Sequence, residues 1–351
     1  MRHAIENVLR QTWQTRGWLS TLLWPVSAVL GMLLRLQQGL YAWGFFKTHR
    51  LPVPVVVVGN VMVGGVGKTP IVMALVAHLQ QQGWQVGVVS RGYGRSAQAQ
   101  QAQPIGEVNT NSTAQDVGDE PLLIHTRCRV PVWVGAQRVL AARALLAAHP
   151  QVQVIVSDDG LQHTALARDI ELCVFDERGI GNGRLLPAGP LREAWPRTSP
   201  VPCFVLNTSP AALSFAPEAM SVSRRLSHTA QQADGTQQPL QHWQQHPACA
   251  VAGIAKPEVF FKMLQDEGVQ LSSTHALPDH ASAAHLAQAV RPLAHQDVLC
   301  TEKDAVKLWP TLPQAWAVPL QVVLPEALLS SLNTALQHAW QSKAGIAPSH
   351  H

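Results

Sequence analysis

The chain carries little charge for its length. Asp, Glu, Lys and Arg make up 14% of its 351 residues, whereas hydrophobic residues make up 46%. This balance is typical of a packed globular protein, and it argues against an intrinsically disordered chain. A chain of this length can form one large domain or two smaller ones.

Cysteine and histidine lack the spacing that marks a disulfide framework or a metal site. The five cysteines are scattered and odd in number, which indicates a reducing compartment. The sixteen histidines include no His-x-x-x-His pair with a third ligand at zinc spacing. The sequence therefore predicts neither disulfide bonds nor a zinc site.

Positive charge is concentrated at the amino-terminal end. Residues 1–50 hold six Lys and Arg against one Glu, an excess larger than the formal net charge of +4 of the whole chain. A basic patch confined to one end favours an anionic surface as partner. Nucleic-acid binding is not expected, because these charges are interleaved with a Leu-rich run rather than with stacking aromatic residues.

The Leu-rich run, residues 17–34, contains no charged side chain. As a helix it would cover roughly 27 Å, just short of a bilayer core of about 30 Å. Pro25 in its middle and the flanking Arg16 and Arg35 favour a helix that lies in the headgroup region. We therefore expect peripheral or monotopic attachment to the cytoplasmic face of a membrane. The alternative is an ordinary helix buried against a sheet.

A strand that runs into a glycine-rich loop is the most informative motif. Residues 53–69 begin with an aliphatic run and end in Gly-Gly-Val-Gly-Lys-Thr. Backbone N–H groups of such a loop can surround a phosphate, and the following helix adds its positive end. Lys68 is expected to reach the β- and γ-phosphates, and Thr69 to ligate Mg²⁺. The predicted nucleotide-binding residues are Met62, Val63, Gly64, Gly65, Val66, Gly67, Lys68 and Thr69.

Met62 departs from the usual pattern, because it stands where most phosphate-binding loops have their first glycine. The remaining form is close to the deviant loops of ATPases that handle membranes, metals or small metabolites. A glycine-rich turn that binds nothing is the alternative. The preceding strand and the apolar helix that follows the loop favour the nucleotide site.

Aliphatic runs alternate with helix-length segments along the chain, which predicts an α/β fold. We expect a P-loop NTPase-like, mostly parallel sheet with helices on both faces, plus a smaller C-terminal α/β domain. The predicted ranges are 1–50 for a membrane-associating helical N-terminus, 51–207 for the P-loop domain, 208–246 for a linker and 247–345 for the smaller domain. Catalytic groups are expected at the carboxyl ends of the parallel strands.

Asp158 and Asp159 end one of these apolar strands. In phosphate-loop proteins an aspartate at such a position holds Mg²⁺, because a hard cation prefers carboxylate oxygen. Asp158 is the predicted magnesium ligand, and Asp159, Gln162 and His163 are expected near the transferred phosphate. The alternative for adjacent aspartates at a strand end is a simple turn.

Three further motifs carry polar side chains. Arg91 lies between glycines in Ser-Arg-Gly-Tyr-Gly-Arg, where a guanidinium can approach phosphate oxygens. Asp119 opens a predicted helix in Gly-Asp-Glu-Pro, so from the local sequence alone its more frequent role would be an N-cap. Residues 181–193 are too rich in Gly and Pro for a regular element and end in Arg-Glu, which is typical of a functional loop.

In their order along the chain, these motifs resemble those of the tetraacyldisaccharide 4'-kinases, the lipid A 4'-kinases of Gram-negative bacteria. The resemblance spans about residues 18–308. It is carried by Gly-Asn and Gly-Gly-x-Gly-Lys-Thr-Pro, Ser-Arg-Gly-Tyr-Gly-Arg, Gly-Asp-Glu-Pro, Asp-Asp-Gly-Leu-Gln-His, Leu-Leu-Pro-Ala-Gly-Pro-Leu-Arg-Glu, Ala-Gly-Ile-Ala-x-Pro, Pro-Asp-His and Thr-Glu-Lys-Asp-Ala-Val-Lys.

The resemblance implies a kinase that uses ATP and Mg²⁺ to phosphorylate the 4'-hydroxyl of a tetraacyldisaccharide 1-phosphate at the cytoplasmic face of the inner membrane. It implies that Asp119 is catalytic with His280 as its partner, which replaces the N-cap interpretation. Lys68 of the phosphate loop is the third predicted catalytic residue. A carboxylate oriented by an imidazole is a suitable general base for a sugar hydroxyl. The remaining active-site residues that it implies are Glu120, Arg192 and Glu193.

Two residues beside His280 depart from the family pattern. Ala281 follows it where the family often has histidine or an aromatic residue, and Leu277 stands where phenylalanine is frequent. A membrane-attached nucleotide switch is the alternative function. Its GTPase form is disfavoured, because Thr301-Glu302-Lys303-Asp304 has its lysine one place later than a guanine-reading motif requires.

Overall fold

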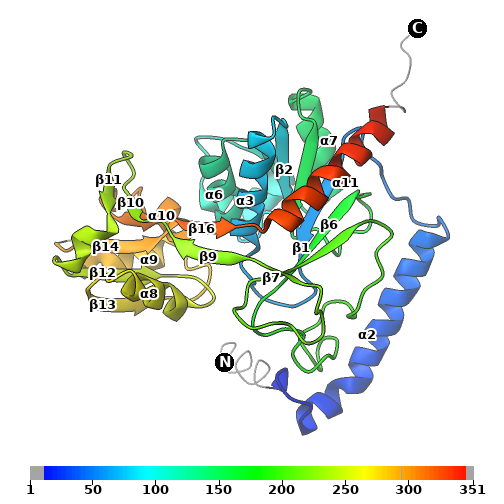
Figure 1. Cartoon of the computed structure of the whole chain (residues 1–351), viewed down its shortest axis with the longest axis horizontal. Helices are drawn as coiled ribbons and strands as arrows, with labels where there is room; N and C mark the ends of the chain where they lie inside the picture. Colours follow the sequence, from blue (N-terminus) through cyan, green and yellow to red (C-terminus); the bar gives the residue numbers. More distant parts are fainter. Residues whose placement is uncertain (1–11, 294, 345–351) are drawn as a thin grey trace.

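The computed structural model describes residues 12–293 and 295–344. Two α/β units, a larger and a smaller one, are joined by a two-stranded ribbon, and one long helix lies at the edge of the larger unit (Figure 1). The expected fold class is confirmed. Arg2 and Arg10, which contribute to the predicted basic end, lie outside the described residues.

The larger sheet has eight strands, and its neighbouring strands run parallel except for the β3–β4 pair at one edge. Aliphatic runs such as the four consecutive valines of β1 are buried on both faces, as a parallel sheet covered by helices requires. In spatial order the strands are β3 (Ile105–Val108), β4 (Val132–Gly135), β2 (Val86–Ser90), β5 (Val154–Asp158), β1 (Val55–Gly59), β6 (Ile170–Phe175), β7 (Cys203–Asn207) and β8 (Met220–Ser221).

Helices cover both faces of this sheet because successive strand residues point to opposite sides. On one face Val56 and Val58 of β1 pack with helices α3 (Lys68–Gln81), α6 (Asp119–Cys128) and α11 (Glu326–Ala344). On the other face Val55 and Val57 pack with α7 (Arg138–Ala148) and with the irregular segment before β7. Two short helices, α4 (Ala97–Ala102) and α5 (Ala114–Val117), lie between β2 and α6.

The smaller sheet is mixed and has its own hydrophobic clusters on both faces. Its strands, in spatial order, are β11 (Gln237–Pro239), β10 (Thr229–Gln231), β15 (Trp316–Val318), β14 (Val298–Thr301), β12 (Ala248–Ala252) and β13 (Leu271–Ala276). Its helices are α8 (Pro257–Asp266), α9 (Ala283–Val290) and α10 (Glu302–Leu308), with 3₁₀ turns η1 (Leu240–Gln244) and η2 (Arg291–Leu293).

Strands β9 (Ser223–Leu226) and β16 (Leu320–Val323) form the ribbon that joins the two units (Figure 1). The chain enters the smaller unit through β9 and returns to the larger one through β16. The cleft between the units therefore lies beside two antiparallel connections rather than a single flexible one.

Two features of the predicted domain ranges differ from the structure. Residues 208–246, expected as a linker, form β8 to β11 and η1, and Trp243 of η1 is fully buried in the smaller unit. Helix α11, expected in the smaller domain, instead packs on the larger sheet through Leu328, Leu332 and Leu336. The polar composition of this segment favoured a linker, but β9 to β11 are short strands whose polar side chains are partly or fully exposed.

Helix α2 (Trp18–Ala42) is longer than the predicted run and holds Pro25 inside it. Its length and apolar composition suffice to cross a membrane, and 11% of its most apolar window is buried. Its exposed side chains include Trp18, Leu22 and Trp24, whereas its buried residues are Ser20 and Ser27. The alternative of an ordinary core helix is therefore wrong for α2.

Candidate active site

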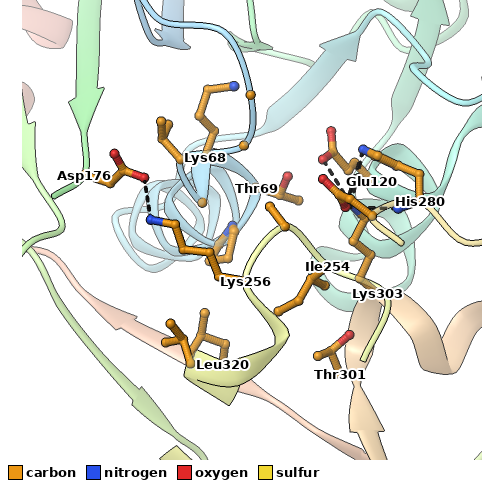
Figure 2. A pocket seen from close by; sticks show the side chains of 18 of the residues that line it. Lys68, Thr69, Glu120, Asp176, Ile254, Lys256, His280, Thr301, Lys303 and Leu320 are labelled. Atoms are coloured by element: carbon orange, nitrogen blue, oxygen red, sulfur yellow. Dashed lines mark hydrogen bonds and ion pairs between the residues drawn. The ribbon is translucent and has the colours of Figure 1, made fainter. Parts of the chain in front are cut away.

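A cleft of about 940 Å³ opens between the two units at the carboxyl edge of the larger sheet. One wall is the loop after β1 with the first turn of α3, and the other comes from the smaller unit, including Ile254 and Lys256 (Figure 2). Strands β1 and β5 are parallel neighbours with Val58 opposite Asp158, so the segments that follow them meet at this edge.

The glycine-rich loop has the conformation that its glycines permit. Gly64 has φ 94° and Gly67 has φ 75°, values that side-chain-bearing residues rarely adopt. Gly67 is the N-cap of α3, so the helix begins directly at Lys68. The loop is held from outside by Arg178, whose Nη2 donates to the carbonyl oxygen of Gly65 at 2.7 Å. This backbone arrangement suits an anion at the helix N-terminus.

Lys68 lies beside acidic and polar partners at the base of the cleft. Its Nζ is 3.3 Å from Asp159 Oδ1 and 3.4 Å from Asn60 Oδ1. Arg192, from the irregular loop, contacts the same two side chains, with Nη2 at 3.2 Å from Asp159 Oδ1. Burial would raise the pKa of Asp159, but the charges of Lys68 and Arg192 hold it at about 2.

Asp158 has the opposite electrostatic character. Burial and the nearby charge of Glu120 raise the pKa of Asp158 to about 7. Its Oδ2 accepts a hydrogen bond from Ser90 Oγ at 3.3 Å, and within the described part of the chain its buried Oδ1 has no hydrogen-bond partner. A buried carboxylate oxygen of this kind gains most from a cation placed against it.

Asp119 and His280 form a pair across the interface of the two units. His280 Nδ1 lies 3.1 Å from both carboxyl oxygens of Asp119, although the two residues are 161 positions apart. Gly118, not Asp119, is the N-cap residue of α6, so the N-cap interpretation does not apply. Burial opposes ionisation, but His280, Lys303 and the neighbouring Lys307 together lower the pKa of Asp119 well below its usual value.

Most of the predicted site residues come together in this cleft. Those that line it are Val63, Gly64, Gly65, Val66, Gly67, Lys68, Thr69, Arg91, Glu120, Asp158, Asp159, Arg192 and His280. Met62 is buried behind the loop and accepts a hydrogen bond from Arg192 Nε at its carbonyl oxygen, at 2.9 Å. Asp119 lies behind His280 and is 4% exposed.

Besides Met62 and Asp119, three predicted residues do not line the cleft: Gln162, His163 and Glu193. Gln162 Nε2 donates to the carbonyl oxygen of Asn60 at 2.9 Å and to Glu193 Oε1 at 2.7 Å, which ties the strand end to the irregular loop. Glu193 is buried and also lies 3.4 Å from Arg197. Burial, with the charges of nearby arginines, lowers the pKa of His163 to about 4. The contacts of Gln162 and Glu193 support the walls of the site rather than its opening.

Several lining residues escaped the sequence interpretation. Lys256 reaches from the smaller unit to Asp176 Oδ2 at 3.1 Å and also contacts Glu177 (Figure 2). Lys303 lies beside His280 and Glu120 on the opposite side of the cleft (Figure 2). Lys256 occupies the variable place of Ala-Gly-Ile-Ala-x-Pro, and only Thr-Glu-Lys-Asp-Ala-Val-Lys could have drawn attention to Lys303.

The comparison with protein families decides the relationship of this chain. The model of the family described as tetraacyldisaccharide-1-P 4'-kinase matches residues 19–337. The chain belongs to this family. The match includes the phosphate loop, the Asp119–His280 pair and the connecting ribbon.

Related sequences carry the same description over nearly their whole length. The tetraacyldisaccharide 4'-kinase of Acidovorax ebreus is 48% identical over 328 residues, which cover 93% of this chain and 94% of the relative. That of Leptothrix cholodnii is 44% identical over 342 residues, covering 93% and 95%. A crystal structure of LpxK from Aquifex aeolicus in complex with ATP superposes with a TM-score of 0.73 at 26% identity, covering 92% of this chain and 99% of that one.

Proposed function

We propose that this protein transfers the γ-phosphate of ATP to the 4'-hydroxyl of a tetraacyldisaccharide 1-phosphate, a step of lipid A biosynthesis. The observation that carries the proposal is the juxtaposition of a phosphate loop and the Asp119–His280 pair around one cleft. A nucleotide switch that only hydrolyses ATP has no need of a general base for a second, alcoholic substrate. Family membership gives the class of acceptor.

Asp119 is the proposed general base. Its lowered pKa keeps the carboxylate ionised at neutral pH, and His280 orients it. The 4'-hydroxyl proton passes to the carboxylate while its oxygen attacks the γ-phosphorus. The bond from that phosphorus to the β-phosphate oxygen breaks, leaving ADP and a 4'-phosphate. Lys68 and the loop amides stabilise the charge that develops on the phosphates.

Mg²⁺ is the proposed cofactor, and the residues present fit it. Thr69, Asp158 and Glu120 supply hard oxygen atoms at the cleft, and Asp158 Oδ1 is the buried oxygen atom without a partner noted above. The described residues contain no cluster of three or more His, Cys, Asp or Glu side chains suited to a metal ion. This agrees with Mg²⁺, which is commonly held by one or two carboxylates together with water and substrate phosphates. When bound, Mg²⁺ neutralises phosphate charge.

The site is proposed to work at the cytoplasmic face of the inner membrane. Helix α2 exposes large apolar side chains from Trp18 to Leu36, and the segment that precedes it contributes Arg16 to the basic end. An apolar face with flanking positive charge suits a bilayer with anionic headgroups. The acylated acceptor would reach the cleft from this surface without leaving the membrane.

A thin-layer assay with radiolabelled ATP and a tetraacyldisaccharide 1-phosphate tests the proposal. The wild-type protein should label the lipid, and Asp119→Asn should lower kcat by about 100-fold or more while nucleotide binding persists, because a general base contributes about 10²–10⁴-fold. Ser331→Ala, on the exposed side of α11, is the control for handling and folding. Release of free phosphate without a labelled lipid would instead support the switch.

A further inference from the structure

The motif Thr-Glu-Lys-Asp-Ala-Val-Lys has no role in the mechanism above, yet it faces the general base. Thr301 begins α10 as its N-cap, with Oγ1 accepting from the backbone N–H of Asp304 at 3.2 Å. Lys303 and Lys307 are four residues apart and therefore lie on one face of α10. This face packs against α6, the helix that Asp119 opens.

Lys307 is the more deeply placed of the two lysines, with 5% of its side chain exposed. Its Nζ donates to the carbonyl oxygen of Ala281 at 3.0 Å and lies 3.4 Å from Asp119 Oδ2. Ala281 directly follows His280, which has φ 58°, an uncommon conformation for a residue with a side chain. One ammonium group thus contacts both the carboxylate and the turn that carries its imidazole partner.

Charge compensation alone does not account for this placement. Lys303 and His280 already lie beside Asp119, with Lys303 Nζ at 3.8 Å from Oδ2. Lys303 is closer to Asp279, at 3.1 Å, and lines the cleft. The contact of Lys307 with the Ala281 carbonyl is a separate, directional interaction within the smaller unit. The contact of the same ammonium with Asp119 joins this turn to the larger unit.

We propose that Lys307 is a positioning residue that sets the distance and angle between Asp119 and His280 across the interface of the two units. The inference rests on the proposed role of this pair. With Lys307 in place the carboxylate keeps one orientation toward the acceptor hydroxyl. Without the ammonium, Asp119 loses a donor and the turn that bears His280 loses its anchor, so the base is less often in the productive geometry.

Lys307→Met tests the inference in the full-length protein. We expect kcat for phosphorylation of a tetraacyldisaccharide 1-phosphate to fall by about 10- to 100-fold with the KM for ATP changed less than about twofold, because the phosphate loop is untouched. Lys307→Gln keeps a donor for the carbonyl but no charge, so its kcat should lie between those of the wild type and Lys307→Met. The matched control is Lys262→Met, a lysine whose side chain is 73% exposed on α8. It should retain wild-type kcat.

A double-mutant cycle separates positioning from a general structural effect. In a His280→Ala background, where no pair remains to be aligned, Lys307→Met should lower kcat by less than about twofold further. An equal loss in both backgrounds, or wild-type kcat in Lys307→Met, would overturn the inference. If thermal denaturation shows that Lys307→Met is poorly folded, the same double-mutant cycle with Lys307→Gln tests the inference instead. Wild-type turnover in Asp119→Asn and His280→Ala would instead refute the proposed base itself.

Discussion

Asp158 and Asp159 are neighbours in the chain, yet the pKa values of their carboxyl groups are shifted in opposite directions. The pKa of Asp158 is raised to about 7 by burial, whereas Lys68 and Arg192 overcome burial and bring that of Asp159 to about 2. The left-handed φ of 49° at Asp159 turns the second carboxylate away from the strand direction. Asp159 therefore already has cationic partners, and Asp158 remains suited to a divalent cation.

His163 should make stability depend on pH. Its pKa is lowered from 6.5 to about 4 by burial and by the charges of Arg138 and Arg168. The unfolded chain therefore binds a proton below pH 6.5 that the folded protein does not take up until about pH 4, so folding stability falls as the pH decreases through this window. After allowance for partial exposure, the effect at pH 5 is about 1–2 kcal/mol.

The measurement is denaturant unfolding of wild type and His163→Gln at pH 7 and pH 5. The wild-type protein should lose about 1–2 kcal/mol more than the variant on acidification. Equal losses in both proteins would show that His163 binds its proton equally in the folded and unfolded states.

Helix α2 is attached to the active site by its two buried serines. Ser20 Oγ donates to the carbonyl oxygen of Ala188 at 2.6 Å, and Ser27 Oγ donates to that of Leu185 at 2.8 Å. The backbone N–H of Ala188 in turn donates to Ser27 Oγ at 3.0 Å. The serines are seven positions apart and so occupy one side of the helix, opposite to much of its apolar surface. These two serines therefore dock α2 onto the loop.

The same irregular loop is bonded to the phosphate loop. The backbone N–H of Val63 donates to the carbonyl oxygen of Pro190 at 2.9 Å, and that of Arg192 donates to Val61 at 2.7 Å. A chain of backbone and side-chain hydrogen bonds thus runs from α2 through residues 185–192 to the loop that binds phosphate. The position of α2 and the position of Arg192 are therefore linked by the backbone of this loop and by its hydrogen bonds.

The double variant Ser20→Ala/Ser27→Ala should separate attachment to the membrane from activity. Each lost buried hydrogen bond is worth about 1 kcal/mol, so α2 should loosen from the loop and kcat should fall several-fold. Co-sedimentation with anionic vesicles should persist, because the exposed apolar side chains are unchanged. Gln37→Ala, at an exposed position of α2, is the control. Loss of vesicle binding with normal kcat would contradict the expectation.

The chain leaves the larger unit through β9, forms the smaller unit and returns to the larger unit through β16. Helix α11 follows the smaller unit in sequence, but Leu328, Leu332 and Leu336 are fully buried against the larger sheet (Figure 1). Across the cleft the units contact through Lys256 with Asp176 on one side and through α10 with α6 on the other. The larger unit is therefore completed only when the last helix has been made.

Leu332→Ala should destabilise the larger unit rather than the smaller one. Truncation of a fully buried leucine costs about 2–5 kcal/mol through lost burial and an unfilled cavity. Hydrogen exchange should show lower protection in β1 and α3, with α8 and β12 little changed. Ser331→Ala, at the neighbouring exposed position of the same helix, should leave both units unaffected. Greater loss of protection in β12 would place α11 with the smaller unit after all.

Local patterns in the sequence determined the central part of the site. A run of valines followed by glycines and Lys-Thr specifies a buried strand, a turn with positive φ and a helix start, all within neighbouring residues. Asp158 was also predictable, because parallel strands end at one edge. The edge strand β3 was missed, since Ile-Gly-Glu-Val has only four residues and half of them are partly exposed.

Contacts between distant segments required the tertiary structure. Resemblance to a family implied the pairing of Asp119 with His280, but the local sequence of Asp119 also fitted an N-cap. No periodicity could show that Lys307 reaches both Asp119 and the Ala281 carbonyl. Nor could it show that Ser20 and Ser27 face a loop more than 150 positions away, or that Gln162 and Glu193 bond to each other. Secondary structure follows from neighbouring residues, whereas these contacts depend on how the units and α2 pack. Packing is a property of the whole chain.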